Sequence, residues 1–513
     1  MNISSIFNRS CRHSSCCITP FFTKRYANGL LVQQGADTEI VGRYRRTALL
    51  AAATCREEQF QEIVKLLIRS GANIDAQDED EDTALHAAAQ AGDTDMVRLL
   101  ISKKARVSVK NDSGKSALDL ACAENKPRVI EHLLNSGATC EPDADGRTEL
   151  HEAIEGGCDA EIIKLFVSKG VNVNARDNEG FSKLPYRCLH TLLTLTGALH
   201  FAATRGDKDI LQTLINAGAA IDVKSDSGTT LLHEAARGGS LEVVQQILEY
   251  SVDIEARDSL NMTPLFAACR DPNGSDEIVR VLLAAGANVS VVDKWGYSPL
   301  HELAKKGRTK AALMLLETGK ANLTQRTQAG SSALGFAAGI GDYELVRSLL
   351  ERGASARSES GEDSALHFAV QTDKNDHLYA IVERLLEEGC DINAKNDIGC
   401  TPLHYFLATN KGKENIVRLF LSRGADINIL DDDGDTVLNC LAQHSEASES
   451  ILELLLENKA DMSLANHEGM TPLHKLAKGG LAAHVRMLLK AGADPSAKDK
   501  HNRQPIQLSL IHI

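Results

Sequence analysis

The stretch TALHAAAQAGDTDMVRLL (83–100) carries the pattern that decides the fold, because copies of it return along most of the chain. Clear copies of its first four letters begin at Thr83, Thr148, Ser298, Ser364, Thr401 and Thr471. Weaker copies begin at Thr47, Ser116, Thr230, Thr263, Ser332, Thr436 and Gln504. Most steps between neighbouring copies are 32 to 37 residues. A steady period of this length indicates a solenoid of stacked units, in which each unit buries its apolar stripe against the next.

Each unit has the signals of a turn followed by two helices. In D-x-x-G-x-T-P-L-H, a glycine such as Gly296 or Gly434 supplies the positive φ of a tight turn. The Thr or Ser caps the first helix, and Pro fits its first position, where the missing N–H costs nothing. Leu and Ala then recur at helical spacing. A Gly-Ala pair such as Gly424-Ala425 ends the second helix.

These motifs resemble the ankyrin repeat, whose units are about 33 residues long. The resemblance covers about residues 30–513. It implies an all-α solenoid of helix-turn-helix units with projecting β-turn fingers. It also implies that fingers and first helices line a concave groove whose variable positions bind a protein partner.

Composition excludes several classes of function. Aromatic residues make up only 4% of the 513 residues, which suits thin helix-on-helix packing without a thick aromatic core. The net charge of −14 disfavours binding to nucleic acid or to an acidic membrane surface. The sequence lacks the long apolar run of a membrane span and the apolar core of a secretory signal. Twelve scattered cysteines are typical of reduced thiols, so we expect a cytoplasmic protein, with the nucleus as a second option.

The repeat pattern predicts two regions. Residues 1–29 form a degenerate or disordered tail, and 30–513 form an array of about 13 full repeats with partial units at both ends. The fifth repeat carries an insertion at 183–197, because removing those fifteen residues restores FSALHFAA, nearly the SALHFA of 364–369. The segment is either an unspliced short intron or a binding loop, since insertions in such arrays lie on one face.

Several turns lack the expected glycine. Glu81 and Glu362 occupy the glycine position, where a positive φ is strained for them, so we expect their turns to differ. Gly361 offers a substitute one residue earlier. Asn261 and Asn502 replace glycine as well, but Asn tolerates the left-handed region.

The sequence contains no convincing catalytic or cofactor site. Eight histidines occupy the fourth place of the helix motif: His86, His151, His200, His233, His301, His367, His404 and His474. They recur with the period of the fold, and the family resemblance implies that each bonds its turn and the adjacent unit. Glu141, Asp143, Asp145, Gly146 and Glu152 imitate a calcium loop, but they fall in the turn-and-cap frame of a repeat. We therefore predict no enzyme activity, no cofactor and no metal.

The finger positions supply candidate partner-binding residues. One segment combines aromatic and basic side chains, and two fingers are acidic; the candidates are Lys294, Trp295, Tyr297, Lys305, Lys306 and Arg308, with Asp78, Asp80, Asp82, Asp431 and Asp433. The structural alternative is that Trp295 packs on a neighbouring finger and that the acidic runs only solvate the tips.

The sequence thus predicts a non-catalytic scaffold that binds one or more proteins on its concave face, with no nucleic acid, no membrane insertion and no small-molecule substrate. The alternative is a substrate-recruiting or sensor portion of a larger protein: a ubiquitin-ligase adaptor, an NTPase-linked receptor or an ankyrin-bearing channel.

Overall fold

The computed structural model describes residues 37–55, 59–141, 146–176, 197–271, 274–357, 362–371, 377–409, 413–441 and 448–509. The tail 1–29 and the inserted segment up to residue 196 lie outside these ranges. The described residues form 27 α-helices, one 3-10 turn at Arg43–Arg45 and three isolated β-bridges, without an extended sheet. The chain divides into two compact units, Met1–Ser259 and Leu260–Ile513.

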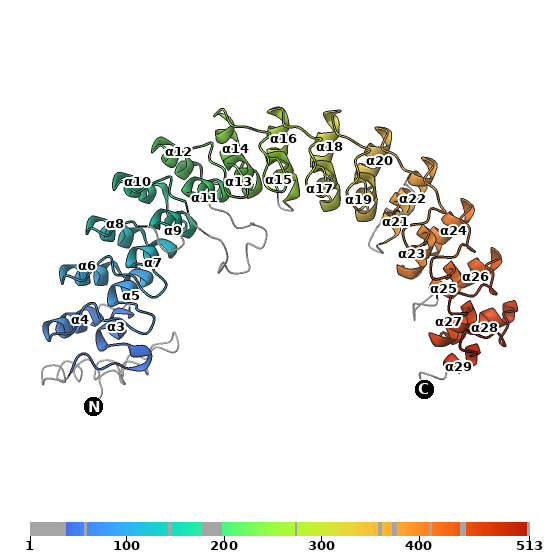
Figure 1. Cartoon of the computed structure of the whole chain (residues 1–513), viewed down its shortest axis with the longest axis horizontal. Coiled ribbons are helices and arrows are strands. Elements are labelled where there is room, and N and C mark those ends of the chain that lie inside the picture. The colour runs from blue at the N-terminus through green and yellow to red at the C-terminus, as the bar shows by residue number, and fades with distance from the viewer. Residues whose placement is uncertain are drawn as a thin grey trace. The chain divides into compact units, whose positions relative to one another are not determined.

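In both units the helices form two layers, one of first helices and one of second helices (Figure 1). In the N-terminal unit the first helices are α3 (Ala48–Ala53), α5 (Ala84–Ala91), α7 (Ala117–Ala123), α9 (Glu149–Gly156), α11 (Ala198–Arg205) and α13 (Leu231–Gly238). The second helices are α4 (Gln59–Arg69), α6 (Thr94–Ser102), α8 (Pro127–Asn135), α10 (Ala160–Ser168), α12 (Lys208–Asn216) and α14 (Leu241–Leu248).

The C-terminal unit repeats this arrangement. Its first helices are α15 (Pro264–Arg270), α17 (Pro299–Lys306), α19 (Ala333–Ile340), α21 (Ala365–Val370), α23 (Pro402–Thr409), α25 (Val437–Leu441), α27 (Pro472–Lys478) and α29 (Pro505–Ser509). Its second helices are α16 (Asp276–Ala284), α18 (Thr309–Glu317), α20 (Tyr343–Glu351), α22 (Leu378–Glu387), α24 (Glu414–Ser422), α26 (Glu449–Glu457) and α28 (Ala482–Ala491).

The core is thin and aliphatic, and it lies between the two helix layers of each repeat and its neighbours. In α17, Leu303 and Ala304 are fully buried, and they face second-layer residues such as Leu315 of α18, which is buried as well. Within each unit, a first helix packs on the first helices next to it, and second helices do the same within their own layer. Stability is therefore shared between adjacent repeats.

The turn before each first helix follows the sequence rules with one correction. Gly296 and Gly434 have φ of 80° and 77°, and Asn261 and Asn502 take φ of 65° and 61°. The expectation that the turn at Glu81 differs is wrong. Glu81 itself adopts φ 59°, and the turn keeps its hydrogen bond from the Glu81 amide to the Asp78 carbonyl. The bonds of the finger hold the glutamate in a region that its side chain disfavours. Gly361 lies outside the described residues, and Glu362 is the first described residue after that gap.

The described residues on the two sides of the gap at 177–196 pair as the two sides of a finger do elsewhere. Isolated antiparallel bridges join Lys110 to Ser116 and Arg326 to Ser332, each six positions apart. The corresponding bridge joins Arg176 to Gly197, which are 21 positions apart. Along the sequence, this spacing is fifteen positions longer than the other two. As a consequence Gly197, which has no side chain, becomes the N-cap of α11, where the other complete motifs supply Ser or Thr.

Candidate partner-binding surface

The histidine row is structural. The amide of Ser298 donates to Nδ1 of His301 (3.2 Å), and Nε2 of His301 bonds the carbonyl of Gln325 in the next finger (3.1 Å). Because Nδ1 accepts a backbone N–H, the ring is neutral and carries its proton on Nε2. Burial lowers the pKa of His301 to about 4. The same pair of bonds recurs at His86, His367, His404 and His474.

The arrangement of these histidines does not form a metal array. Within the described ranges, no three His, Cys, Asp or Glu side chains are grouped so that they could hold a metal ion. Two residues of the segment that imitates a calcium loop, Asp143 and Asp145, lie outside the described residues. The carboxylate of Glu152 lies 3.3 Å from Lys115 Nζ and 3.4 Å from Arg147 Nε, so it serves in ion pairs between repeats.

The acidic fingers divide into buried turn-formers and exposed tips. Asp78 is almost fully buried, accepts the amides of Asp80 and Asp82, and pairs with Arg46 at 3.0 Å. Asp431 likewise accepts the amide of Asp433 at 3.0 Å. Asp82 is half-buried and accepts from Asn111. Of the five acidic candidates, Asp80 and Asp433 are exposed to solvent.

Arg308 belongs to the scaffold rather than to the surface. Its side chain is 8% exposed, and its guanidinium lies 2.9 Å from the Asp276 carboxylate. The same group donates to the carbonyl of Ala268 in the last turn of α15 (2.6 Å) and to the carbonyl of Asp271 directly after that helix (3.2 Å). Lys306, by contrast, is exposed at the end of α17. Sequence reasoning grouped the two because they are close in the chain, but only Lys306 reaches solvent.

The aromatic candidates lie together with cations on the finger and first-helix side of the C-terminal unit. Trp295 is 39% exposed at its finger tip. Lys294 Nζ lies 4.5 Å from the centre of its indole ring, and the Arg270 guanidinium lies 5.9 Å away. Lys305 Nζ lies 5.0 Å from the centre of the Tyr297 ring. Four of the sequence candidates therefore form two cation–ring contacts on one finger and the helix after it: Lys294 with Trp295, and Lys305 with Tyr297.

Two further aromatic residues extend this patch and were missed by sequence reasoning. Phe336 of α19 stacks on Tyr297 (centroids 5.8 Å apart, 19° between planes), and Phe368 of α21 lies 5.8 Å from Phe336. Both rings are half-buried. The sequence does contain a signal for them, because both residues directly follow the fourth place of the helix motif and so occupy the same position in successive repeats. We call Tyr297, Phe336 and Phe368 the aromatic row.

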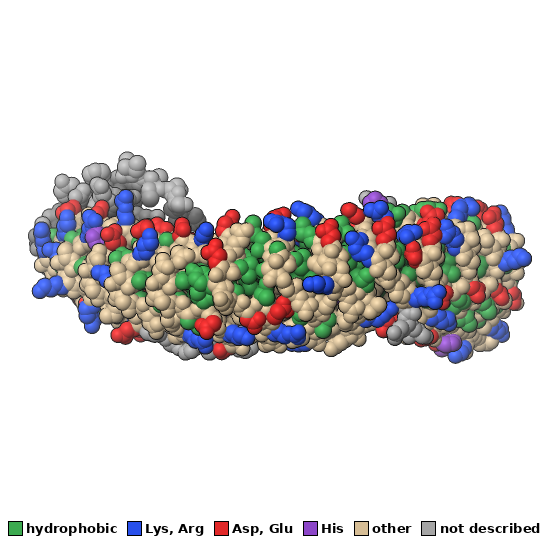
Figure 2. Space-filling model, turned by 90° about the horizontal axis from the view of Figure 1, so that it is seen from above, with side chains coloured by type: hydrophobic (Ala, Val, Ile, Leu, Met, Phe, Trp, Pro, Cys, Tyr) green, Lys and Arg blue, Asp and Glu red, His purple; other side chains and the backbone are tan. Residues whose placement is uncertain are grey.

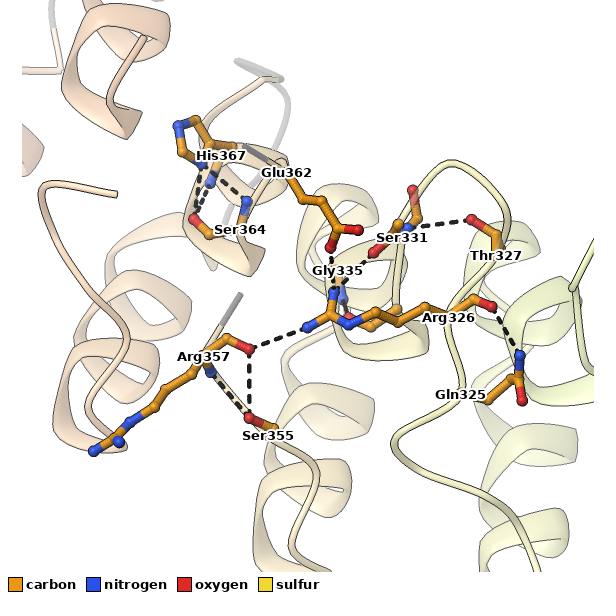
Figure 3. Close-up of polar contacts among 12 residues, drawn as sticks. Gln325, Arg326, Thr327, Ser331, Gly335, Ser355, Arg357, Glu362, Ser364 and His367 are labelled. Atoms are coloured by element: carbon orange, nitrogen blue, oxygen red, sulfur yellow. Dashed lines mark hydrogen bonds and ion pairs between the residues drawn. The ribbon is translucent and has the colours of Figure 1, made fainter. Parts of the chain in front are cut away.

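A polar link beside the aromatic row fixes successive fingers. The Arg326 guanidinium lies 3.1 Å from both the Glu362 carboxylate and the Arg357 carbonyl (Figure 3). Ser364 and His367 form the cap of α21 nearby. Phe368 is thus held by a helix whose start is anchored to the preceding repeat.

Charges are distributed differently on the second-helix side. In the view from above, acidic and basic side chains are interspersed along each unit, without a broad area of one sign on the face shown (Figure 2). Many pair within a helix, as Arg384 does with Glu387 and Glu388 on α22. Exposed Tyr379, also on α22, serves as a reference point in the second-helix layer, outside the aromatic row.

Comparison with known proteins agrees with this architecture. A family model described as "Ankyrin repeats (3 copies)" matches in overlapping placements across residues 49–177 and 199–499. The chain belongs to the ankyrin-repeat family. Ankyrin repeats are protein-interaction modules and are generally non-catalytic. Among the described residues of this ankyrin chain, no helix combines the length and apolarity needed to cross a membrane.

Several relatives are longer proteins. The chain is 27% identical to the human transient receptor potential cation channel subfamily A member 1 over 418 residues, covering 71% of this chain and 36% of the channel. It is 27% identical to the E3 ubiquitin-protein ligase KEG of Arabidopsis thaliana, covering 64% of this chain and 20% of the ligase. It is also 31% identical to mouse NF-kappa-B inhibitor delta, covering 44% of this chain and 75% of that protein. The chain thus spans about a third of the length of the human channel and about a fifth of the length of the Arabidopsis ligase.

Proposed function

We propose that this ankyrin chain is a non-catalytic scaffold that binds a protein partner on the finger and first-helix side of its C-terminal unit. The observation that supports the proposal is the row of half-exposed aromatic rings from Tyr297 to Phe368, which Lys305 borders, together with Trp295 and Lys294 on the same finger as Tyr297. Tyr, Trp and Arg are enriched at interface hot spots, and a preformed solenoid face loses little conformational entropy on binding.

The sequence candidates now carry different weights in this proposal. Lys294, Trp295, Tyr297 and Lys305 form its centre, and Lys306 lies at the edge. Asp80 and Asp433 are exposed tips for additional contacts, whereas Asp78, Asp431 and Arg308 act within the scaffold. Neither nucleic acid, a small-molecule substrate nor membrane insertion is part of the proposal.

The test is affinity capture from source-cell lysate, quantified by mass spectrometry. The baits are the full chain, the double variant Trp295→Ala/Lys305→Glu, and the control Tyr379→Ala, which removes a similarly exposed ring from α22. We expect partners to be retained by the control and lost by the double variant. Partners recovered equally by all three baits refute this surface.

A second candidate function is supported by the partial coverage of the relatives. The chain matches only 36% of a channel and 20% of a ubiquitin ligase, so the array could serve as the recruiting or sensing portion of a longer protein. Long-read sequencing of the transcript tests this directly. A reading frame that adds a pore or catalytic domain supports it, and a transcript encoding only these residues refutes it. The same reads show whether the codons for 183–197 are always present, which decides between intron and loop.

A further inference from the structure

The position of Phe368 in the aromatic row depends on a glycine in the preceding repeat. Gly335 of α19 stands where eight of the repeats have histidine. A Cβ atom at Gly335 would lie 2.9 Å from Cδ2 of Phe368, closer than real Cβ atoms approach. The absent side chain lets the Phe368 ring lie over the backbone of α19. Three consecutive repeats thereby contribute rings to one low apolar strip.

The strip continues onto further apolar and small residues. Gly339 lies one helical turn after Gly335, and Ile340 is 46% exposed at the end of the same helix. Large exposed apolar groups clustered on a soluble protein typically mark a binding site. The half-buried rings of the row leave edges and faces that a bulky apolar side chain can cover.

One end of the strip carries exposed positive charge. Within the described residues, Lys294, Lys305 and Lys306 form no ion pair with a carboxylate. Glu302 lies among them but is 7% exposed, and burial raises its pKa despite the nearby cations. Asp293 is buried too, and its carboxylate accepts the amides of Trp295 and Tyr297. The charge presented to solvent here is therefore positive, on a chain whose net charge is −14.

The opposite end of the strip presents negative charge. The fingers beyond Phe368 carry the exposed side chains of Asp397, Asp432 and Asp433. An acidic group on a partner is attracted to the Lys294–Lys306 end and repelled from the Asp397–Asp433 end. Complementary charge of this kind fixes the register and direction of a bound segment more than it adds affinity.

We propose that this strip binds an extended peptide segment in which an acidic side chain stands a few residues from a bulky apolar one. The apolar side chain covers Phe336 and Phe368, and the acidic side chain faces Lys305 and Lys294. Lys305 is suited to this role because it borders both Tyr297 (5.0 Å) and Phe336 (5.8 Å), so one cation adjoins both parts of the ligand. This inference rests on the proposed function, since it specifies the ligand of the same face.

The experiment is selection of random 12-residue peptides displayed on phage against the immobilised full chain, followed by fluorescence polarisation with synthetic peptides. We expect enrichment of Asp or Glu near Leu, Ile, Phe or Met, and affinity that falls with added salt. Lys305→Glu, a change at an exposed side chain, should weaken the binding of the selected acidic peptides at least about tenfold. Peptides in which the acidic residue is replaced by Lys should bind this variant again. Phe336→Ala should abolish binding, with circular dichroism confirming the fold, and Tyr379→Ala should leave it unchanged.

The possible outcomes separate this inference from the proposed function. Peptides that lose binding to Phe336→Ala but lack an acidic preference overturn the inference and leave the binding face in place. Peptides that bind all variants equally overturn both, as does a selection that enriches nothing. Single-stranded DNA that competes at the same site as tightly as the best peptide overturns the peptide assignment. The selected peptides can also match a surface segment of this chain itself. If sedimentation then shows a concentration-dependent dimer, the occupant is a second copy of the chain, and the peptide assignment is overturned.

Discussion

His301 provides a quantitative test of the capping network, because its folded and unfolded forms titrate differently. The pKa falls from 6.5 in the unfolded chain to about 4 in the fold, through burial. Since the unfolded state binds the proton more tightly, the contribution of His301 to stability is complete above pH 6.5. It is lost progressively as the pH falls from 6.5 towards 4. At pH 5 these two values correspond to a loss of about 2 kcal/mol.

The chain itself suggests the comparison variant. Asn439 occupies the equivalent place at the start of α25, where its amide N–H lies 3.4 Å from Thr436 Oγ1 and its Nδ2 donates to the Asp435 carboxylate. His301→Asn therefore removes the titrating group while keeping a residue type that this position accepts. The variant is expected to be less stable than wild type at pH 7.5, and the difference should shrink by about 2 kcal/mol at pH 5.

The assay is urea unfolding at pH 7.5 and pH 5.0, followed by circular dichroism. Hydrogen exchange of the α17 amides is measured in parallel, because long arrays can unfold in parts. An NMR titration of the His301 ring gives its pKa directly. A stability difference that stays constant between the two pH values would falsify the linkage, and so would a folded pKa near 6.5.

Two further changes test the scaffold. Gly197→Ser should stabilise the chain by a few tenths of a kcal/mol, because α11 lacks a side-chain cap and, among the described residues, an added Cβ meets only the Ala175 carbonyl at 3.6 Å. Gly197→Ala, which adds the Cβ without the hydroxyl, is its control, and equal melting temperatures for both variants contradict the capping argument. Arg308→Ala should cost about 3 kcal/mol, since it leaves the Asp276 carboxylate and two carbonyls without their partner. Lys306→Ala should be neutral in the same urea titration; similar losses for both would show that Arg308 is not the buried anchor.

Much of the fold was predictable because its signals act within a few residues. Thr83 caps α5 through the amide of His86, three residues away, and the first helices begin at the residues that the repeated motif indicates. Charge and spacing also identified Trp295, Tyr297 and Lys305 as neighbours, since all belong to one finger and the helix that follows it. The turn at Glu81 was predicted wrongly, because the bonds from Asp78 outweigh the intrinsic preference of a single residue.

The sequence by itself determined the repeat, the order of turn and helices, the caps and the aliphatic core, because each is specified inside one unit. Only the tertiary structure decided which side chains reach solvent and which meet across units. It buried Arg308 against α15 and left Lys306 exposed, although the two are neighbours in sequence. It also joined Tyr297, Phe336 and Phe368 from three repeats, with Gly335 leaving room for the Phe368 ring. Such contacts depend on how adjacent units stack, and one-dimensional periodicity does not encode the distances between their side chains.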